Sequence, residues 1–376
     1  MKKIVTVGGG TGGYTVLSGL KYIPDIEITA LVSMADDGGS TGVLRDELGV
    51  LPPGDVRQCL VALSEHSDIV RKLMNYRFSE GTLSGHSFGN IFLAALEKVS
   101  GDFTAGVEVA SEILKVKGRV IPVTENKAEL LVTLGDGRVL FGENVLNHAD
   151  IQEYGVAHIG YKDNVAINSH AYEALLSADV IVLGPGNYYC SIIPCLITDG
   201  FKEVIKKTKA KVVFPVNLTN KQGHTMGWTV SDYVTHVEEF IGRKFDYVLI
   251  NNELPSQQQI KQYELQEGDG VMVIDDYTDT NAKRLPLLSH LLVQQEKEDV
   301  LSSIRSFIRH DSKQLAEGIQ NLCRKHADEE IIFVDNDANF FNDIDMMQCE
   351  NLKTVLFNEN GIGNLEVELQ KSIHNE

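Results

Sequence analysis

The residues in this sequence best suited to binding chemistry are glycines and small polar side chains that directly follow apolar runs. The first such segment spans residues 8–13 and holds five glycines in six positions, between an apolar stretch and a helical pattern of Leu17, Leu20 and Ile23. This order predicts a strand, a tight turn and a helix. Backbone N–H groups in such a turn and the positive end of the helix dipole favour an anion, so a phosphate is the expected ligand.

This glycine segment alone does not separate a nucleotide site from an ordinary βα turn. It lacks the complete GxGxxG pattern with its ribose-reading acid, and no GK[ST] follows as in a Walker A loop. By itself the pattern fits the ordinary turn better, so the binding prediction depends on the polar segments further along the chain. With those included, the predicted ligand-binding residues here are Gly9, Gly10, Thr11 and Gly12.

The second polar segment, residues 35–42, combines carboxylates with hydroxyls at the end of another apolar run. Asp36 and Asp37 could hold a metal-bridged phosphate or orient a hydroxyl nucleophile, and Ser40 and Thr41 could assist in binding. The alternative is a helix N-cap, for which Asp and Ser are common. One cap needs only one such residue, so the pattern favours a function.

The third segment, residues 51–63, begins with two prolines that fix a turn before a helix. Asp55 could cap this helix, and Arg57 then lies in its first turn, where the helix dipole disfavours a cation. Arg57 therefore needs a partner, which is either Asp36 or Asp37 in an ion pair, or a ligand phosphate. The sequence leaves these alternatives open.

Later polar residues repeat the same arrangement. In residues 81–96, His86 and Asn90 are four positions apart at a glycine-rich helix start and could share one helical face, although a capped and packed helix also explains them. Two further apolar runs end in polar loops. These loops add Gly184, Gly186, Asn187 and Asn217 to the predicted binding set.

Apolar runs that alternate with helical patterns predict an α/β fold with a mostly parallel sheet. Ligands of such sheets bind in the crevice at the carboxyl ends of the strands, where the polar loops fall. Residues 119–160 depart from this pattern, because short alternating runs flank the turn at residues 135–137. That departure predicts an antiparallel β-hairpin insert on the parallel sheet.

Composition excludes several classes of protein. The chain has 376 residues and a formal net charge of −19, which opposes binding to nucleic acid or anionic lipid. No apolar run approaches the roughly 20 residues of a membrane-spanning helix. The five cysteines and eleven histidines lack zinc-site spacing, so no metal site is predicted from them. We expect a cytoplasmic protein without membrane insertion.

The segments together resemble the YvcK (gluconeogenesis factor) branch of the CofD-like proteins. The resemblance is collinear over residues 1–322 and rests on five motifs, which read GGGTG from residue 8, ADDGGSTG from 35, PPGDVRQCL from 52, SGHSFGN from 84 and GPGNYYCSIIP from 184. It implies a three-layer αβα Rossmann-like domain over residues 1–322, followed by an α/β extension of unknown role over residues 323–376.

The resemblance also implies a function. It indicates a regulatory protein that binds UDP-sugars, notably UDP-N-acetylglucosamine, and links carbon metabolism to cell-wall synthesis and cell shape. A cell-wall enzyme or a regulatory protein would be its partner, and a homo-oligomer stays open. By the surrounding pattern, Tyr263 and Arg309 correspond to the family's UDP-sugar-binding Tyr and Arg. Three positions depart from the family motifs: Asn187, Cys190 and His224, the last in place of an acidic residue.

Two other functions remain as alternatives. One is a 2-phospho-L-lactate transferase-like enzyme, in which Asp36 or Asp37 positions Mg²⁺ or accepts a proton. The weaker one is a dinucleotide-dependent oxidoreductase, because the acid expected about 20 residues after the glycines falls in a second glycine loop. In the extension, Asp335 and Asp337 faintly resemble the final acidic motif of haloacid dehalogenase-type phosphatases, but a segment without catalysis is favoured.

Overall fold

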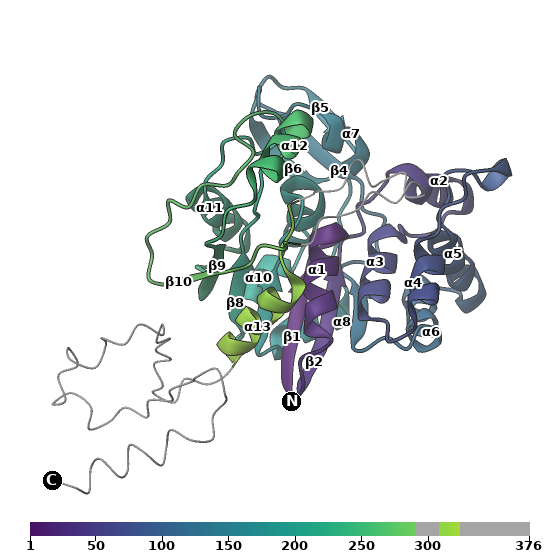
Figure 1. Cartoon of the computed structure of the whole chain (residues 1–376). Helices are drawn as coiled ribbons and strands as arrows, with labels where there is room; N and C mark the ends of the chain where they lie inside the picture. The colour runs from purple at the N-terminus through teal and green to yellow at the C-terminus, as the bar shows by residue number, and fades with distance from the viewer. Residues whose placement is uncertain (291–307, 324–376) are drawn as a thin grey trace, which may run out of the picture. The chain divides into compact units, whose positions relative to one another are not determined.

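The computed structural model describes residues 1–290 and 308–323, and Met1–Cys323 form one compact unit. Its centre is a sheet of seven parallel strands in the order β10-β9-β8-β7-β1-β2-β3 (Figure 1). The strands are β1 (Lys2–Val7), β2 (Ile26–Val32), β3 (Arg119–Pro122), β7 (Val180–Leu183), β8 (Lys211–Pro215), β9 (Tyr247–Asn251) and β10 (Ala282–Leu285). The predicted α/β fold with a mostly parallel sheet is confirmed.

Both faces of this sheet are covered by helices, which explains why its strands are apolar on both sides. Alternate residues of one strand belong to two different apolar clusters, as Ile4 and Val5 show. One face is covered by α1 (Gly10–Leu20), α3 (Gly54–Leu63), α5 (Phe88–Ser100), α6 (Phe103–Ile113) and α13 (Ser312–Cys323). The other face is covered by α8 (Ser169–Ser177), α9 (Ile193–Leu196), α10 (Phe201–Lys207) and α11 (Val230–Ile241).

The first helix is enclosed by the last helix of the described residues. α13 packs along α1, and a Cβ placed on Gly19 would lie 1.9 Å from the carbonyl oxygen of Ser312. Only glycine permits this approach. The remaining helices lie around the loops and are α2 (Gly39–Leu48), α4 (Asp68–Asn75), α7 (Glu143–His148) and α12 (Gln257–Glu267).

The predicted hairpin is present in a small sheet of its own. β4 (Leu130–Leu134) pairs antiparallel with β5 (Val139–Phe141) and with β6 (Val156–Tyr161), in the order β5-β4-β6. Residues 119–122, which fall inside the predicted insert, instead join the parallel sheet as β3 beside β2. The burial patterns agree with this division, because β4 alternates between buried and half-buried residues whereas three consecutive residues of β3 are buried.

Several sequence predictions can be compared with the described part of the chain. The cysteines of the described residues, Cys59, Cys190, Cys195 and Cys323, are free thiols, whereas Cys349 lies outside the described residues.

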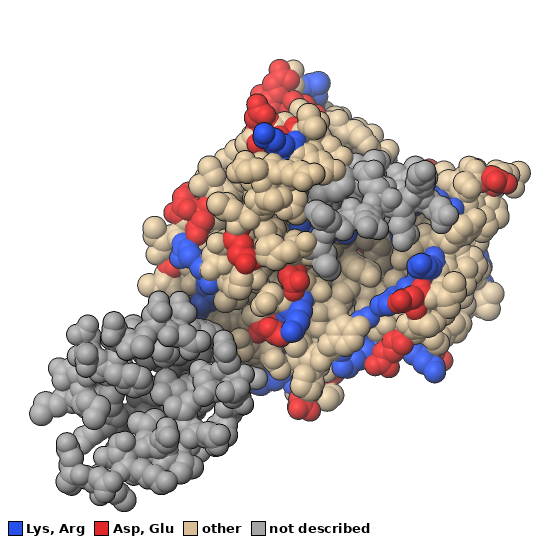
Figure 2. Space-filling view, in the orientation of Figure 1, with Lys and Arg blue, Asp and Glu red and all other residues tan. Residues whose placement is uncertain are grey.

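Residues 1–290 and 308–323 contain no helix both long and apolar enough to cross a membrane. Acidic and basic side chains are interspersed on the face shown in Figure 2. The predicted C-terminal extension, with Asp335 and Asp337, lies outside the described residues except for Cys323.

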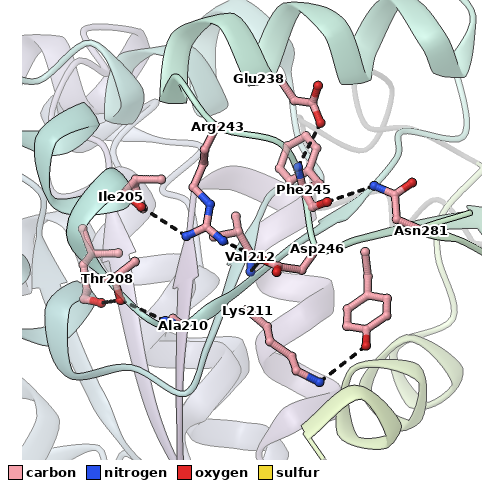
Figure 3. Close-up of polar contacts among 12 residues, drawn as sticks. Ile205, Thr208, Ala210, Lys211, Val212, Glu238, Arg243, Phe245, Asp246 and Asn281 are labelled. Atoms are coloured by element: carbon pink, nitrogen blue, oxygen red, sulfur yellow. Dashed lines mark hydrogen bonds and ion pairs between the residues drawn. The ribbon is translucent and has the colours of Figure 1, made fainter. Parts of the chain in front are cut away.

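Polar contacts fasten α11 to the start of β9, at the opposite end of the sheet from the predicted site (Figure 3). The buried side chain of Glu238 accepts a hydrogen bond from the backbone N–H of Phe245 at 2.9 Å. The carbonyl oxygen of Phe245 accepts one from Asn281 Nδ2, also at 2.9 Å. Glu238 also forms an ion pair with the exposed Lys244 at 2.7 Å. A single carboxylate therefore holds the turn that leads into β9.

We expect the substitution Glu238→Ala to lower the free energy of unfolding by about 1–3 kcal/mol, because it leaves the buried N–H of Phe245 without its acceptor. Glu238→Gln keeps an oxygen acceptor and should cost less. Urea denaturation monitored by circular dichroism measures the difference. Glu239→Ala, an exposed position on the same helix, is the control, and an equal loss in both alanine variants would contradict the assignment.

Candidate functional site

A cavity of about 370 Å³ lies at the carboxyl ends of β1, β7 and β8. The strand order places the loops that follow these three strands next to one another. Residues of α7, α11 and α12 and residues 308–310 also line the cavity. Nine predicted binding residues line this cavity: Gly9, Gly10, Thr11, Gly12, Gly186, Asn187, Asn217, Tyr263 and Arg309.

The glycine turn after β1 allows close packing on two sides. A Cβ on Gly12 would lie 1.9 Å from the carbonyl oxygen of Pro185, and one on Gly9 would lie 1.9 Å from Asp55 Oδ2. The turn therefore fits tightly between the β7 loop and α3. α1 begins at Gly10, so its N-terminal N–H groups and the positive end of its dipole are at the cavity.

The loops after β7 and β8 are joined by a pair of hydrogen bonds. Asn217 Nδ2 donates to the carbonyl oxygen of Gly186 at 2.8 Å, and the N–H of Gly186 donates to Asn217 Oδ1 at 3.2 Å. The side chain of Asn217 thus hydrogen bonds to both the N–H and the carbonyl group of Gly186, which lines the cavity. Gly184, which precedes the cis peptide bond to Pro185, is not among the residues that line the cavity.

Another part of the lining is formed by residues distant in the sequence. Tyr263, on α12, is 7% exposed, and its hydroxyl accepts a hydrogen bond from Thr219 Oγ1 at 3.1 Å. Its ring packs in a small apolar cluster with Leu218 and Ile308. Arg309 follows Ile308 directly, so the Tyr and the Arg indicated by the family resemblance face one cavity.

Several lining residues were not predicted. Lys221 and Asn147 add polar groups, and an aromatic cluster lies behind them, in which the ring of Trp228 is 4.9 Å from that of Tyr188 and 5.1 Å from that of Tyr233. Lys221 lies in the loop that contains Asn217 and His224, and no pattern in the sequence indicates that Asn147 contacts this loop. Other unpredicted lining residues include Thr15, Ser191, His224 and Glu267.

His224 is neutral in this environment. Burial, followed by the charge of Lys221, lowers the pKa of its imidazole to about 4. Its Nε2 lies 3.0 Å from the carbonyl oxygen of Leu146. The residue that stands in place of the family's acid therefore contributes no charge to the cavity near pH 7.

A second group of predicted residues lies beside the cavity and does not line it. Asn90 Nδ2 donates to Ser40 Oγ at 3.5 Å and to Thr41 Oγ1 at 3.3 Å, and Ser40 Oγ lies 3.1 Å from His86 Nδ1. Arg57 Nε donates to Asn90 Oδ1 at 2.9 Å. The structure thus brings these residues together, with hydrogen bonds to one another, and their predicted role in ligand binding stays a prediction.

Two local expectations need correction. Asp55 does not cap α3, because Pro53 occupies the N-cap and Asp55 instead accepts a hydrogen bond from the N–H of Gly10 at 3.0 Å. His86 does not share a helical face with Asn90, because α5 begins at Phe88 after the N-cap Ser87. Arg57 hydrogen bonds to the amide side chains of Asn75 and Asn90, and its charge opposes the rise in the pKa of Asp36 that burial causes. Neither of its two predicted partners, a neighbouring carboxylate or a ligand phosphate, is thereby decided.

Three carboxyl groups, Asp36, Asp55 and Glu143, form what we call the acidic cluster. Burial is the largest cause that raises the pKa of each, and the negative charge of Asp36 raises the pKa of the other two further. The pKa of Glu143 rises to about 8. Through the contact between Asp55 and Gly10, this cluster adjoins the glycine turn. Asp37 lies next to it and accepts a hydrogen bond from the N–H of Asn144 at 2.7 Å.

The acidic cluster does not form a metal centre of the usual geometry. Within residues 1–290 and 308–323, no group of three or more His, Cys, Asp or Glu side chains is arranged to hold a metal ion. The side chains of Asp36 and Asp37 are instead hydrogen bonded to the N–H groups of Gly38 and Asn144. Because Mg²⁺ is commonly held by one or two carboxylates together with substrate phosphates, the Mg²⁺ of the transferase alternative stays a prediction.

Comparison with known proteins gives one consistent family. The family described as 2-phospho-L-lactate transferase CofD matches residues 4–292. A Thermotoga maritima protein named provisionally as a gluconeogenesis factor is 41% identical over 323 residues, which are 86% of this chain and 99% of that protein. The gluconeogenesis factor of Bacillus subtilis is 35% identical over 328 residues, which are 86% of this chain and 98% of that protein.

A solved structure shows the same similarity. A crystal structure of a UPF0052 family member from Bacillus halodurans superposes with a TM-score of 0.76 at 33% sequence identity. The match covers 85% of this chain and 100% of that chain. The three-layer arrangement of the parallel sheet is therefore shared with a structure of clearly related sequence.

We expect the substitution Glu143→Gln to reduce the pH dependence of stability. The unfolded carboxyl loses its proton near pH 4.3, whereas the folded one keeps it up to about pH 8. Between these values the folded state binds one proton more than the unfolded state, so the free energy of unfolding falls as pH rises. The variant should lose about 1–3 kcal/mol less unfolding free energy than the wild type between pH 5 and 8.

Chemical denaturation at several pH values measures this effect. Glu108→Gln, at an exposed position on α6, is the matched control and should follow the wild type. A Glu143→Gln curve parallel to that of the wild type would contradict the raised pKa.

Proposed function

Since this chain belongs to the CofD family and is of the gluconeogenesis factor type, we propose that it is a regulatory protein whose cavity binds a UDP-sugar, with UDP-N-acetylglucosamine as the first candidate. In this proposal the bound nucleotide sugar reports the state of carbon metabolism. The protein then acts in the cytoplasm on a cell-wall enzyme or a regulatory protein that influences cell shape. Binding alone carries the signal, so no chemical step is required.

One observation carries the proposal: a single cavity combines a phosphate-binding backbone with cationic and aromatic side chains. The N-terminal turn of α1 offers N–H groups to an anion. Arg309 offers a planar guanidinium that can bind a diphosphate through two hydrogen bonds. Tyr263 offers a ring on which a uracil base can stack. These are the three kinds of group that a nucleoside diphosphate sugar requires.

The charge of the cavity differs from that of the whole chain. The chain has a net charge of −19, yet the described lining residues include two cations, Lys221 and Arg309, and one carboxylate, Glu267. A local positive charge in an acidic protein supports an anionic ligand of small size rather than a polyanion. A nucleotide sugar meets both requirements.

A second candidate is a phosphoryl-group transferase of the 2-phospho-L-lactate transferase type. The observation that favours it is the acidic cluster beside the glycine turn, because active sites often bring together carboxyl groups with raised pKa values. If this candidate is correct, Asp37→Asn should abolish product formation from a nucleotide-linked donor in the presence of Mg²⁺ and leave ligand affinity nearly unchanged. The absence of turnover in the wild type under those conditions would leave the binding proposal in first place.

The binding proposal predicts that UDP-N-acetylglucosamine binds in preference to GDP and NAD, as measured by calorimetry. Tyr263→Ala should weaken this binding about 10- to 100-fold through the loss of base stacking, and Arg309→Ala should weaken it to a similar extent. Tyr263→Phe keeps the ring and is the matched control. Trp228, the single tryptophan of the chain, contacts two lining tyrosines, so its fluorescence gives a second readout.

Two results would contradict this proposal. The first is no detectable binding of any UDP-sugar to the full chain. The second is Mg²⁺-dependent affinity for a guanosine nucleotide without affinity for UDP-N-acetylglucosamine, which would place the transferase first.

A further inference from the structure

Lys221 carries one of the two positive charges in the described lining of the cavity. It lies in the loop after β8, four residues beyond Asn217, and its side chain is half-buried. Burial lowers the pKa of its ammonium group, and the charges of Glu267 and Glu143 oppose that shift.

The ammonium group of Lys221 is held by a neutral residue. Its Nζ donates to the carbonyl oxygen of Asn147 at 2.8 Å and also to the side-chain Oδ1 of Asn147. The same Oδ1 accepts a hydrogen bond from Asn187 Nδ2 at 3.0 Å. Both oxygens that Asn147 presents to Lys221 are uncharged, so these contacts position the ammonium without neutralising it.

These contacts place Lys221 on the same side of the cavity as the glycine loops. Asn187 follows Gly186 directly, and Gly186 is paired with Asn217 at the start of the loop that carries Lys221. Gly12 of α1 packs against the same β7 loop. A continuous set of close contacts therefore runs from the N-terminus of α1 to the lysine, and a diphosphate bound at the helix terminus would be near it.

We propose that Lys221 is a specificity-determining residue that binds the diphosphate of the nucleotide sugar, and that Asn147 is its positioning residue. This inference rests on the proposed function and names the group that recognises the charged part of the ligand. An ammonium group has three N–H donors, of which the oxygens of Asn147 take two, so a third can reach a phosphate oxygen. The hydrogen-bond acceptors of Lys221 are neutral, so its charge acts through space on the nearby carboxylate of Glu267 and on a phosphate that binds in the cavity.

The test uses the full chain, calorimetry and three probes: UDP-N-acetylglucosamine, uridine and inorganic diphosphate. Lys221→Met should weaken binding of UDP-N-acetylglucosamine about 10- to 100-fold, as expected for loss of a charge-assisted hydrogen bond. The same substitution should change the affinity for uridine by less than about twofold, because uridine carries no phosphate. Lys221→Arg should retain more of the affinity. Lys261→Met, at an exposed position on α12, is the matched control and should behave as the wild type.

Asn147→Asp tests the positioning role. It keeps the shape of the side chain but gives Lys221 an anionic partner, so affinity for UDP-N-acetylglucosamine should fall, while the free energy of unfolding should not. The salt dependence of binding should also decrease, as in Lys221→Met. Full affinity in Asn147→Asp would overturn the role assigned to Asn147.

The outcomes separate this inference from the proposed function. Equal affinity of wild type and Lys221→Met for UDP-N-acetylglucosamine would overturn the inference and leave the function in place. Equal losses for uridine and for the nucleotide sugar would also overturn it, since they would indicate a structural role. If the wild type bound inorganic diphosphate through Lys221 but no UDP-sugar, the proposed function would fail and the anion-binding role of Lys221 would stand.

Discussion

The site depends on the close approach of two backbones, the first turn of α1 and the loop after β7. A side chain at Gly12 would collide with the carbonyl group of Pro185, so the two segments can meet only because this position is glycine. Parallel pairing of β1 with β7 fixes the separation at which they meet. The loop after β8 is then attached through the amide pair between Asn217 and Gly186. The glycine turn thus organises the site by allowing contact rather than by making the chain flexible.

The local features of the fold could be predicted because each depends on the pattern of residues in a short stretch of sequence. The strand, turn and helix around Gly9 follow from composition over about twenty residues, and the hairpin follows from alternation around a turn. The rule that parallel strands present their loops at one edge then brought Gly186 and Asn217 to the same cavity as the first turn. Tyr263 and Arg309 came from the family resemblance, since nothing in their own neighbourhood distinguishes them.

From the sequence alone it was not possible to tell which of the predicted residues line the cavity and which belong to the second, hydrogen-bonded group beside it. That division is set by packing of α3 and α5, which turns Arg57 towards the amides of Asn75 and Asn90. Asn147 and Glu143 were missed for a related reason. They lie on α7, which connects two strands of the small antiparallel sheet along the chain. Only the three-dimensional placement of that helix brings Asn147 to Lys221 and Glu143 to the acidic cluster. Contacts between distant segments of this kind leave no periodic pattern in a single sequence.

The position of β1 in the middle of the sheet has a consequence for biosynthesis. Its second neighbour is β7, so about half of the chain must emerge from the ribosome before both edges of β1 are paired. The face of α1 around Gly19 stays uncovered even longer, until α13 has been made. β1 and α1 are therefore made well before the segments that finish enclosing them, and during translation they present an open strand edge and an apolar helix face. A nascent-chain chaperone that shields this edge and this face would protect them until β7 and α13 have been made.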